Sequence, residues 1–199
     1  MATGKGTLAG RRADRVTPTP TPTPTLTTAR LTLRPRGAQD AAALFATMAD
    51  PDAMRWWSHP PFASVDDLAA HFAERGDGPW RAWAILRTGE ARAVGFVAAG
   101  PKRQGGVAEI GYLIARDATG QGIAREAVAA VIDRLFAEGY RRVFADTDPD
   151  NKASIRLLER LGFTLEGRLR GEWQTHIGIR DSLIYGLLAE ERDRGTAEL

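Results

Sequence analysis

Cysteine is absent from this chain of 199 residues. Its absence excludes structural disulfides, thiolate zinc sites and a catalytic cysteine. Histidine is scarce, and His59, His71 and His176 lie far apart in the sequence, so we expect no metal site. Long apolar runs are also missing, because none approaches the roughly 20 residues with which a helix crosses a bilayer. We therefore expect neither a metal nor a membrane among the partners of this protein.

Most of the chain has no excess of positive charge, although its formal net charge is +2. The first 30 residues carry a net charge of +4 and the remainder sums to −2, because the basic excess belongs to Lys5, Arg11, Arg12, Arg15 and Arg30. A basic tail is not a nucleic-acid-binding domain, so we expect no nucleic-acid partner. The tail also lacks the apolar centre of a secretory signal, which favours a cytoplasmic protein.

A low-complexity Thr–Pro alternation marks the predicted boundary of the folded part. The stretch "TPTPTPTPT" at Thr17–Thr25 cannot form a helix and favours an extended polyproline conformation. We predict that residues 1–28 form a disordered tail, which is either a flexible appendage or a docking arm. Residues 29–190 are long enough for one domain with a core, and residues 191–199 form a short C-terminal tail.

Hydrophobic periodicity predicts alternating groups of strands and helices in residues 29–190. Strands are predicted at 29–35, 80–88, 91–100, 107–115, 141–148, 163–173 and 180–191. Helices are predicted at 37–50, 64–76, from about Gly120 to Gly139, and at 151–162, with a short Trp-rich stretch before the second. The order βααα-βββ-αβ-αββ predicts an α/β protein with a mixed sheet and helices on both faces.

The stretch "ATGQGIAREA" (Ala118–Ala127) places two helix-weakening glycines where a long helix begins. The first N–H groups of a helix have no partner within it, and the helix dipole is positive there, so a helix start favours anions. Glycine lets a pyrophosphate approach without meeting a Cβ. A Walker loop is absent, and the dinucleotide fingerprint Gly-x-Gly-x-x-Gly fails at Arg125, where its third glycine belongs.

Two segments resemble the GNAT acyltransferases. "TGQGIA" matches the end of their coenzyme A loop, Gln/Arg-x-x-Gly-x-Gly/Ala, at Gly122 and Ala124, with Thr119 in place of the usual first residue. "NKASIRLLERLGFTLEGRLR" resembles their segment Asn-x-x-Ser-x-x-x-x-Glu-x-x-Gly-Phe, matched by Asn151, Ser154, Glu159, Gly162 and Phe163. The closing "RDSLIYGLLAEE" resembles their last strand. The resemblance covers about residues 29–190 and is greatest to the branch that contains the ribosomal-protein-alanine N-acetyltransferases RimJ and RimL.

The resemblance implies a fold, a co-substrate and a site. The fold would be a mostly antiparallel sheet with a splayed parallel pair, and acetyl-CoA would be the co-substrate. The coenzyme would contact the loop residues Thr119, Gly120, Gln121, Gly122, Ile123, Ala124 and Arg125, the helix-start residue Asn151, and the strand residues Tyr112, Leu113 and Ile114, whose backbone N–H groups would polarise the thioester. Glu109 would take the proton of the attacking amine, and Ser154 would serve the departing thiolate.

Each catalytic assignment has a structural alternative. Glu109 is either a general base or a strand residue that is ion-paired to an arginine. Ser154 is either an acid for the thiolate or an inert residue in the first helical turn. Many relatives carry a tyrosine acid in this helix, but Leu158 stands nearest to its position and cannot donate a proton.

The binding assignments have alternatives as well. Asn151 is suited to cap its helix, and this role is compatible with a coenzyme contact. Trp56 and Trp57 either fill the core or line the acceptor cleft, since two adjacent tryptophans cannot face the same way. Arg125 is either a solvated helix residue or a phosphate ligand.

Three functions remain open at this stage. The leading one is an acetyl-CoA-dependent N-acetyltransferase that acts by direct attack in a ternary complex on the amine of a protein or peptide N-terminus. The second has a small-molecule amine or an antibiotic as its acceptor. The third is a non-catalytic acyl-CoA-binding sensor. The aromatic and proline residues of 52–62 favour a peptide acceptor, because an aminoglycoside would require several carboxylates. The sequence does not decide between a monomer and a homodimer.

Overall fold

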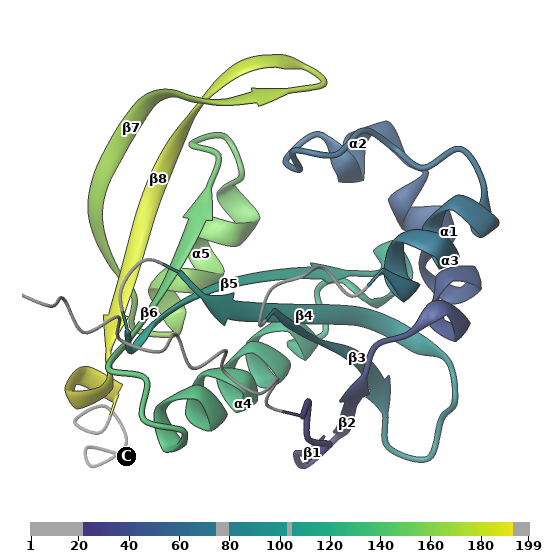
Figure 1. Cartoon of the computed structure of the whole chain (residues 1–199), viewed down its shortest axis with the longest axis horizontal. Helices are drawn as coiled ribbons and strands as arrows, with labels where there is room; N and C mark the ends of the chain where they lie inside the picture. The colour runs from purple at the N-terminus through teal and green to yellow at the C-terminus, as the bar shows by residue number, and fades with distance from the viewer. Residues whose placement is uncertain (1–21, 75–79, 103–104, 193–199) are drawn as a thin grey trace, which may run out of the picture.

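The computed structural model describes residues 22–74, 80–102 and 105–192. Its strands form one eight-stranded sheet in the order β1-β2-β3-β4-β5-β6-β8-β7. The strands are β1 Leu26–Thr27, β2 Leu31–Pro35, β3 Arg81–Arg87, β4 Ala93–Pro101, β5 Val107–Ile114, β6 Arg142–Thr147, β7 Thr164–Thr175 and β8 Gly178–Leu188. The α-helices are α1 Ala41–Met48, α2 Pro51–Met54, α3 Val65–Ala73, α4 Ile123–Ala137 and α5 Lys152–Arg160. The predicted α/β fold class with a mixed sheet and helices on both faces is confirmed (Figure 1).

Cross-strand register determines which side chains share a face of the sheet. Strands β2 to β5 form an antiparallel meander, in which Ala98 lies opposite Gly111 and Val97 lies opposite Tyr112. Directly opposed residues point to the same face, and neighbours along a strand point to opposite faces. Phe96 packs against Trp57 and against Phe72 of α3, so its face is the one that α1, α2 and α3 cover. We call this the α1–α3 face, and the opposite one the α4 face.

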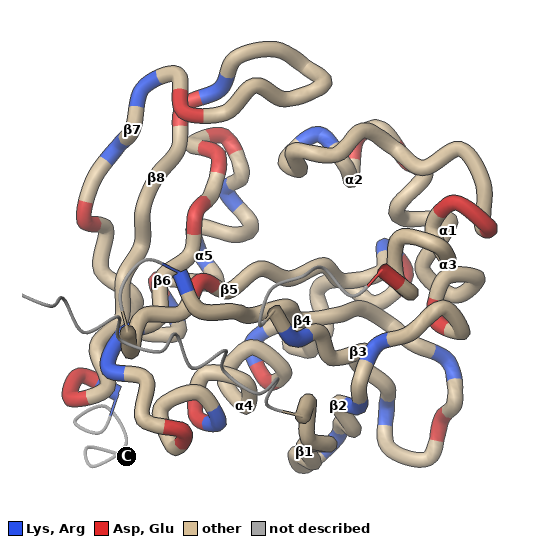
Figure 2. Tube along the Cα trace, viewed as in Figure 1, with Lys and Arg blue, Asp and Glu red and all other residues tan. Residues whose placement is uncertain are grey.

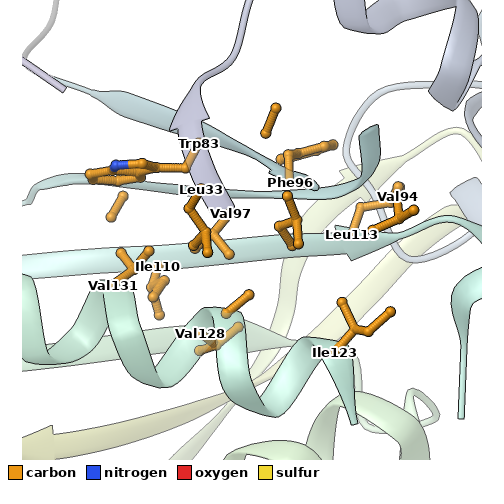
Figure 3. Packing of buried hydrophobic residues seen from close by; sticks show 14 of the residues in the cluster. Leu33, Trp83, Val94, Phe96, Val97, Ile110, Leu113, Ile123, Val128 and Val131 are labelled. Atoms are coloured by element: carbon orange, nitrogen blue, oxygen red, sulfur yellow. The ribbon is translucent and has the colours of Figure 1, made fainter. Parts of the chain in front are cut away.

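Helix α4 packs its apolar stripe on the other side of the sheet. The predicted spacing of four residues, Ile123, Ala127, Val131 and Leu135, is buried along its whole length. In Figure 3 Val128 and Val131 of the helix lie next to Ile110 of β5, while Phe96 and Leu113 lie on the far side of the strands. The central strands are therefore buried on both faces, which explains their nearly continuous apolar sequences.

Strands β5 and β6 diverge after a short paired segment. They are the one parallel pair of the described sheet, and their register contains only Val107↔Arg142, Ala108↔Val143 and Glu109↔Phe144. Beyond Glu109, β5 continues to Ile114 beside β4, while β6 continues to Thr147 beside β8. Figure 1 shows β6, β8 and β7 turning away from β5, so that the sheet opens like a V. This is the splayed pair that the resemblance implied.

The folded part begins earlier than Ala29, so the predicted tail boundary was wrong. Residues Leu26–Thr27 form β1 and pair with Thr32–Leu33 of β2. The carbonyl of Pro24 accepts a hydrogen bond of 2.8 Å from Nε1 of the buried Trp83. A strand of two residues is too short to leave a periodic signal, and the tertiary hydrogen bond to Pro24 has no local signature. Residues 1–21 of the predicted tail lie outside the described residues.

Other element boundaries also shift. Helix α4 begins at Ile123 rather than near Gly120, because Gly120 and Gly122 have the positive φ angles 75° and 76°. Strand β8 ends at Leu188, and Arg192 in the following helical turn pairs with Asp133 of α4, so the predicted C-terminal tail starts too early. No helix of the described residues has the length and apolarity to span a membrane.

Candidate active site

The glycine turn before α4 has two residues in the left-handed region, and only glycine adopts this region without strain. Gly122 is the N-cap residue and supplies no side-chain cap. The first intrahelical bond of the turn joins the N–H of Glu126 to the carbonyl of Gly122, so the N–H groups of Ile123, Ala124 and Arg125 have no partner within the helix. A Cβ built on Gly120 would meet nothing within 4 Å. The turn therefore has the free donors and the space that the sequence analysis required for a pyrophosphate.

Two arginines that the sequence analysis missed border this turn. Arg30 Nη1 donates to the carbonyl of Gln121 at 3.2 Å, and Arg87 Nη2 donates to the side-chain oxygen of Gln121 at 2.8 Å. Gln121 is thus engaged in holding the turn, and the hydroxyl of Thr119 similarly donates to the carbonyl of Arg116 at 2.9 Å. Arg30, in the bend before β2, and Arg87, at the end of β3, both come from far earlier in the chain, so no local motif could have identified them.

Glu126 fixes Arg30 beside the turn. Its carboxylate accepts bonds from the Thr28 hydroxyl at 2.6 Å and from Arg30 Nε at 2.7 Å. Burial alone would raise the pKa of Glu126, but these hydrogen bonds outweigh it and lower the pKa. Arg30 remains 57% exposed, and its Nη2 would lie 3.3 Å from a Cβ at Gly122, so the guanidinium is available to a phosphate on the turn.

The backbone of β5 offers N–H groups on its open side. Ala115 donates to Val94 of β4 and Val107 accepts from Lys102, so the polar groups of odd-numbered residues in β5 face β4. By alternation, the N–H groups of Tyr112 and Ile114 point away from β4, to the side where β6 has diverged. The N–H of Leu113 faces β4 instead, and its side chain is buried opposite Phe96, so Tyr112 and Ile114 have the more accessible donors.

Ser154 lies against Tyr112 on the α4 face. The Tyr112 hydroxyl is 2.8 Å from Ser154 Oγ, and either oxygen can donate. Burial raises the pKa of Tyr112 to about 12, although the bond with Ser154 acts in the opposite direction. Asn151 caps α5 by accepting a bond of 3.1 Å from the N–H of Ser154, which confirms the predicted cap. Leu158, nearest to the position where many relatives carry a tyrosine, is fully buried in the core. The phenol that contacts Ser154 comes instead from Tyr112 of β5.

Glu109 lies on the opposite, α1–α3 face, at the last paired position before the strands diverge. Its side chain is 16% exposed, and Oε2 is 2.8 Å from Lys102 Nζ, so its partner is a lysine and not the arginine that the alternative invoked. Trp80 covers the neighbouring Gly100, where a Cβ would lie 2.6 Å from the indole. A Cβ at Gly111 would meet nothing within 4 Å, so there is open space next to Glu109 on this face.

The two predicted substrate-binding tryptophans have different environments. Trp57 packs against Phe96 with ring centroids 5.7 Å apart and is partly buried against the core. Trp56 is half-buried and carries the Arg55 guanidinium 4.8 Å above its ring. Only Trp57 therefore adjoins the α1–α3 face beside Leu113, the neighbour of Phe96 in the sheet. Arg125 is exposed on α4.

Asp146 is a second carboxylate on the α1–α3 face that the sequence analysis missed. It shares the face of Phe144, which pairs with Glu109, because the two residues are two positions apart in β6. Its oxygens accept bonds from the Ser182 hydroxyl and, at 2.9 Å, from Trp173 Nε1. Charged residues otherwise concentrate near the ends of elements and on the β7–β8 hairpin, while most of β5 is uncharged (Figure 2). Within the described ranges, no group of three or more acidic or histidine side chains is arranged to hold a metal.

Comparison with known proteins identifies relatives in sequence and in structure. A family model described as an acetyltransferase (GNAT) domain matches residues 30–164. Uncharacterized N-acetyltransferase p20 of Bacillus licheniformis is 31% identical over 170 residues, which are 82% of this chain and 96% of that protein. A crystal structure described as a probable GNAT-family acetyltransferase from Chromobacterium violaceum has a TM-score of 0.79 at 26% identity and covers 97% of this chain and 98% of its own.

A more distant likeness concerns the fold alone. RimL, described as a ribosomal L7/L12 alpha-N-protein acetyltransferase in complex with coenzyme A, has a TM-score of 0.72 at 20% identity, with 83% of this chain and 98% of that chain covered. The family assignment depends on the closer matches. Because the GNAT model matches more than half of the chain, this protein belongs to the GNAT family and is an acetyl-CoA-dependent acetyltransferase.

Proposed function

We propose that this protein transfers an acetyl group from acetyl-CoA to a primary amine, with a peptide N-terminus as the favoured acceptor, by direct attack in a ternary complex. One observation carries the proposal: Glu109 and Ser154 lie on opposite faces of β5, at the point where β5 and β6 separate. Acyl transfer requires a base where the amine enters and an acid where the thiolate leaves. The two faces provide these positions separately.

The coenzyme would be held by residues of the glycine turn and α4. Gly120 leaves room for the pyrophosphate, the N–H groups of Ile123–Arg125 donate to it, and Arg30 adds a charge beside it. When bound, the coenzyme supplies the activated thioester. Asn151 stabilises the start of α5, and this places Ser154 beside β5.

The reaction then needs three contributions from this chain. The N–H groups of Tyr112 and Ile114 donate to the thioester oxygen as negative charge develops on it. Glu109 accepts the proton that the amine loses as the new C–N bond forms, and Lys102 must yield its place at the carboxylate. Ser154 Oγ gives its proton to the thiolate as the C–S bond breaks and regains one from solvent after coenzyme A leaves, while the hydrogen bond to the Tyr112 hydroxyl holds Ser154 in position.

Aromatic side chains around the α1–α3 face favour a peptide acceptor. Trp57 and Trp80 adjoin β4 at either end of the face that carries Glu109, and their rings suit an extended, largely uncharged backbone. Asp67 lines a depression of about 410 Å³ together with His59, His71 and Glu74, so this carboxylate has two histidines as neighbours. The likeness to RimL is consistent with a protein acceptor.

A panel assay tests the proposal. The full-length chain would be incubated with acetyl-CoA and with short peptides bearing free Ala, Ser or Met termini, aminoglycosides or polyamines, and free coenzyme A would be measured. Peptides blocked by N-terminal acetylation serve as the matched controls, and parallel reactions with succinyl-CoA test the acyl group. A tenfold preference for the polycations, about 1.4 kcal/mol in transition-state binding, would overturn the peptide acceptor. If no acceptor in the panel releases coenzyme A, the remaining function would be that of an acyl-CoA-binding sensor.

A further inference from the structure

Arg36 is a charged residue that extends over the α1–α3 face of the sheet. Its N–H donates to the carbonyl of Ala82 at 2.9 Å, which continues the β2–β3 register by one residue beyond Pro35↔Trp83. Arg36 therefore shares its face with Ala82 and, across the register, with Ala98 and Gly111. This is the face of Glu109, and the row between them consists of small side chains.

The guanidinium of Arg36 packs against two aromatic rings. Its Cζ lies 4.0 Å from the ring centroid of Phe72 on α3 and 4.7 Å from that of Phe96 on β4. Since Phe96 belongs to β4, the side chain reaches from β2 across β3 toward the middle of the sheet. The centroids of these two rings are only 6.0 Å apart, so the rings do not sandwich the guanidinium, and its N–H groups are left for a ligand.

In the described part of the chain, no carboxylate forms a salt bridge with Arg36. Arg36 Nε is buried without a hydrogen-bond partner among the described residues. Burial lowers the pKa of Arg36 to about 10, and the nearby charge of Asp40 offsets this only in part. Asp40 itself is occupied, because it accepts bonds from Arg34 at 2.6 and 2.9 Å and from the N–H of Gly37 at 3.0 Å. A half-buried charge without a salt-bridge partner costs free energy of folding, so its presence calls for another explanation.

We propose that Arg36 binds a carboxylate of the acceptor and thereby selects an amine that carries a carboxylate nearby. The inference rests on the proposed function, in which the amine approaches Glu109 on the same face. The open space at Gly111 lies between the two charged groups. An acceptor with its amine at Glu109 and its carboxylate at Arg36 spans one to two strand spacings across the sheet and two residues along it, roughly 8–12 Å. An acidic side chain near a peptide N-terminus fits this span, and a free amino acid offers the same pair of groups at closer range.

Two matched pairs of acceptors distinguish these sources. The first pair, Ala-Asp-Ala-amide and Ala-Asn-Ala-amide, differs only in the charge of the second side chain. The second pair, alanine and alaninamide, differs only in the charge of the α-carboxyl group. For the full-length protein we expect kcat/KM to favour the Asp peptide over the Asn peptide by about tenfold, as charge-assisted hydrogen bonds allow. A preference confined to alanine over alaninamide would identify a free amino acid as the source instead. Equal rates within both pairs would overturn the proposal.

The variant Arg36→Met keeps the packing against the two rings and removes the charge. We expect the preference within the favoured pair to fall to less than twofold, while Arg160→Gln, which removes an exposed charge at the end of α5, leaves it unchanged. Thermal unfolding separates binding from structure: a binding role predicts that Arg36→Met melts at the same or a higher temperature. A lower melting temperature with an unchanged preference would assign Arg36 a purely structural role.

A binding measurement keeps this test independent of the reaction. Calorimetry with coenzyme A present would compare the Asp and Asn peptides for the native chain and for Arg36→Met. If no acceptor in any assay releases coenzyme A but the Asp peptide still binds through Arg36, the proposed reaction fails and the carboxylate site stands. If the protein acetylates the Asp and Asn peptides at equal rates, the proposed reaction stands and the carboxylate site fails.

Discussion

At the scale of single residues, the two faces of β5 separate Glu109, the proposed base, from Ser154, the proposed acid, and its partner Tyr112. The division follows from alternation along the strand, since an odd and an even position cannot share a face. Nothing else on the strand competes, because its remaining side chains are apolar or glycine. The proposed base and the proposed acid can therefore be removed by separate substitutions.

Glu109→Gln keeps the shape of the side chain and removes the base. We expect kcat/KM to fall by roughly 10²–10⁴ at neutral pH, with a smaller loss at high pH, where the amine is deprotonated without help. Lys102→Met is the matched variant, because it frees the carboxylate from its ion pair and retains the base. A loss in Glu109→Gln that does not change with pH would mean that Glu109 only positions the acceptor.

Ser154→Ala should lower kcat more than the affinity for acetyl-CoA, because the hydroxyl acts on the departing thiolate. Tyr112→Phe should lower kcat by about tenfold, the worth of one well-placed hydrogen bond. With a pKa of about 12, above the ordinary value of 10, Tyr112 stays protonated throughout the assay range, so its effect should not vary between pH 6 and 9. The double variant should be no slower than Ser154→Ala, since Tyr112 acts through Ser154. Additive losses would separate the two residues.

At the scale of elements, the turn before α4 and the N-terminal segment each do more than connect. The turn aligns the free N–H groups of a helix that spans the sheet, and β1 adds an edge to it. Neither role depends on a reactive side chain. Both are therefore tested through the backbone, by a glycine substitution in the turn and by truncation of the N-terminal segment, each with a matched control.

Gly120→Ala places a methyl group in the space assigned to the pyrophosphate. Its φ of 75° makes alanine costly there, so Gly139→Ala, with a φ of 90° and equally open surroundings at the other end of α4, is the matched control for strain. We expect calorimetry to show weaker acetyl-CoA binding for Gly120→Ala, with native affinity for Gly139→Ala. Equal affinities in two folded variants would place the pyrophosphate elsewhere.

Two truncations separate the N-terminal segment into parts. A chain that starts at Thr21 should keep its melting temperature, whereas one that starts at Ala29 loses β1, the Pro24 carbonyl that Trp83 needs, and the Thr28 hydroxyl bound to Glu126. An unpaired buried donor costs about 1–3 kcal/mol, and each kcal/mol lowers Tm by roughly 2–4 °C in a domain of this size. We expect a fall of about 5–10 °C by calorimetric scanning. Equal melting temperatures would show that this segment contributes nothing.

At the scale of the whole molecule, sequence patterns predicted what is local. The meander, the long helix and the Asn151 cap each follow from periodicity or from a few adjacent residues. The arginines proposed to contact the substrates could not be predicted in this way, because their neighbours come from other segments. Arg30 and Arg87 reach Gln121 from distant parts of the chain, and Arg36 reaches Phe96 across an intervening strand. Their positions depend on strand order and register, which no single segment encodes.

The three-pair contact between β5 and β6 also has a consequence for folding. Strands β2 to β5 pair only with sequence neighbours, while β6, β8 and β7 form a second unit that meets the first in the sheet through those three pairs. Short-range pairing closes small loops and proceeds quickly, whereas the β5–β6 pairing must wait for α4 to fold back over the meander. The same separation of strands that would leave room for a thioester therefore leaves the two units joined in the sheet by only three residue pairs, and we expect this joint to open before either unit unfolds.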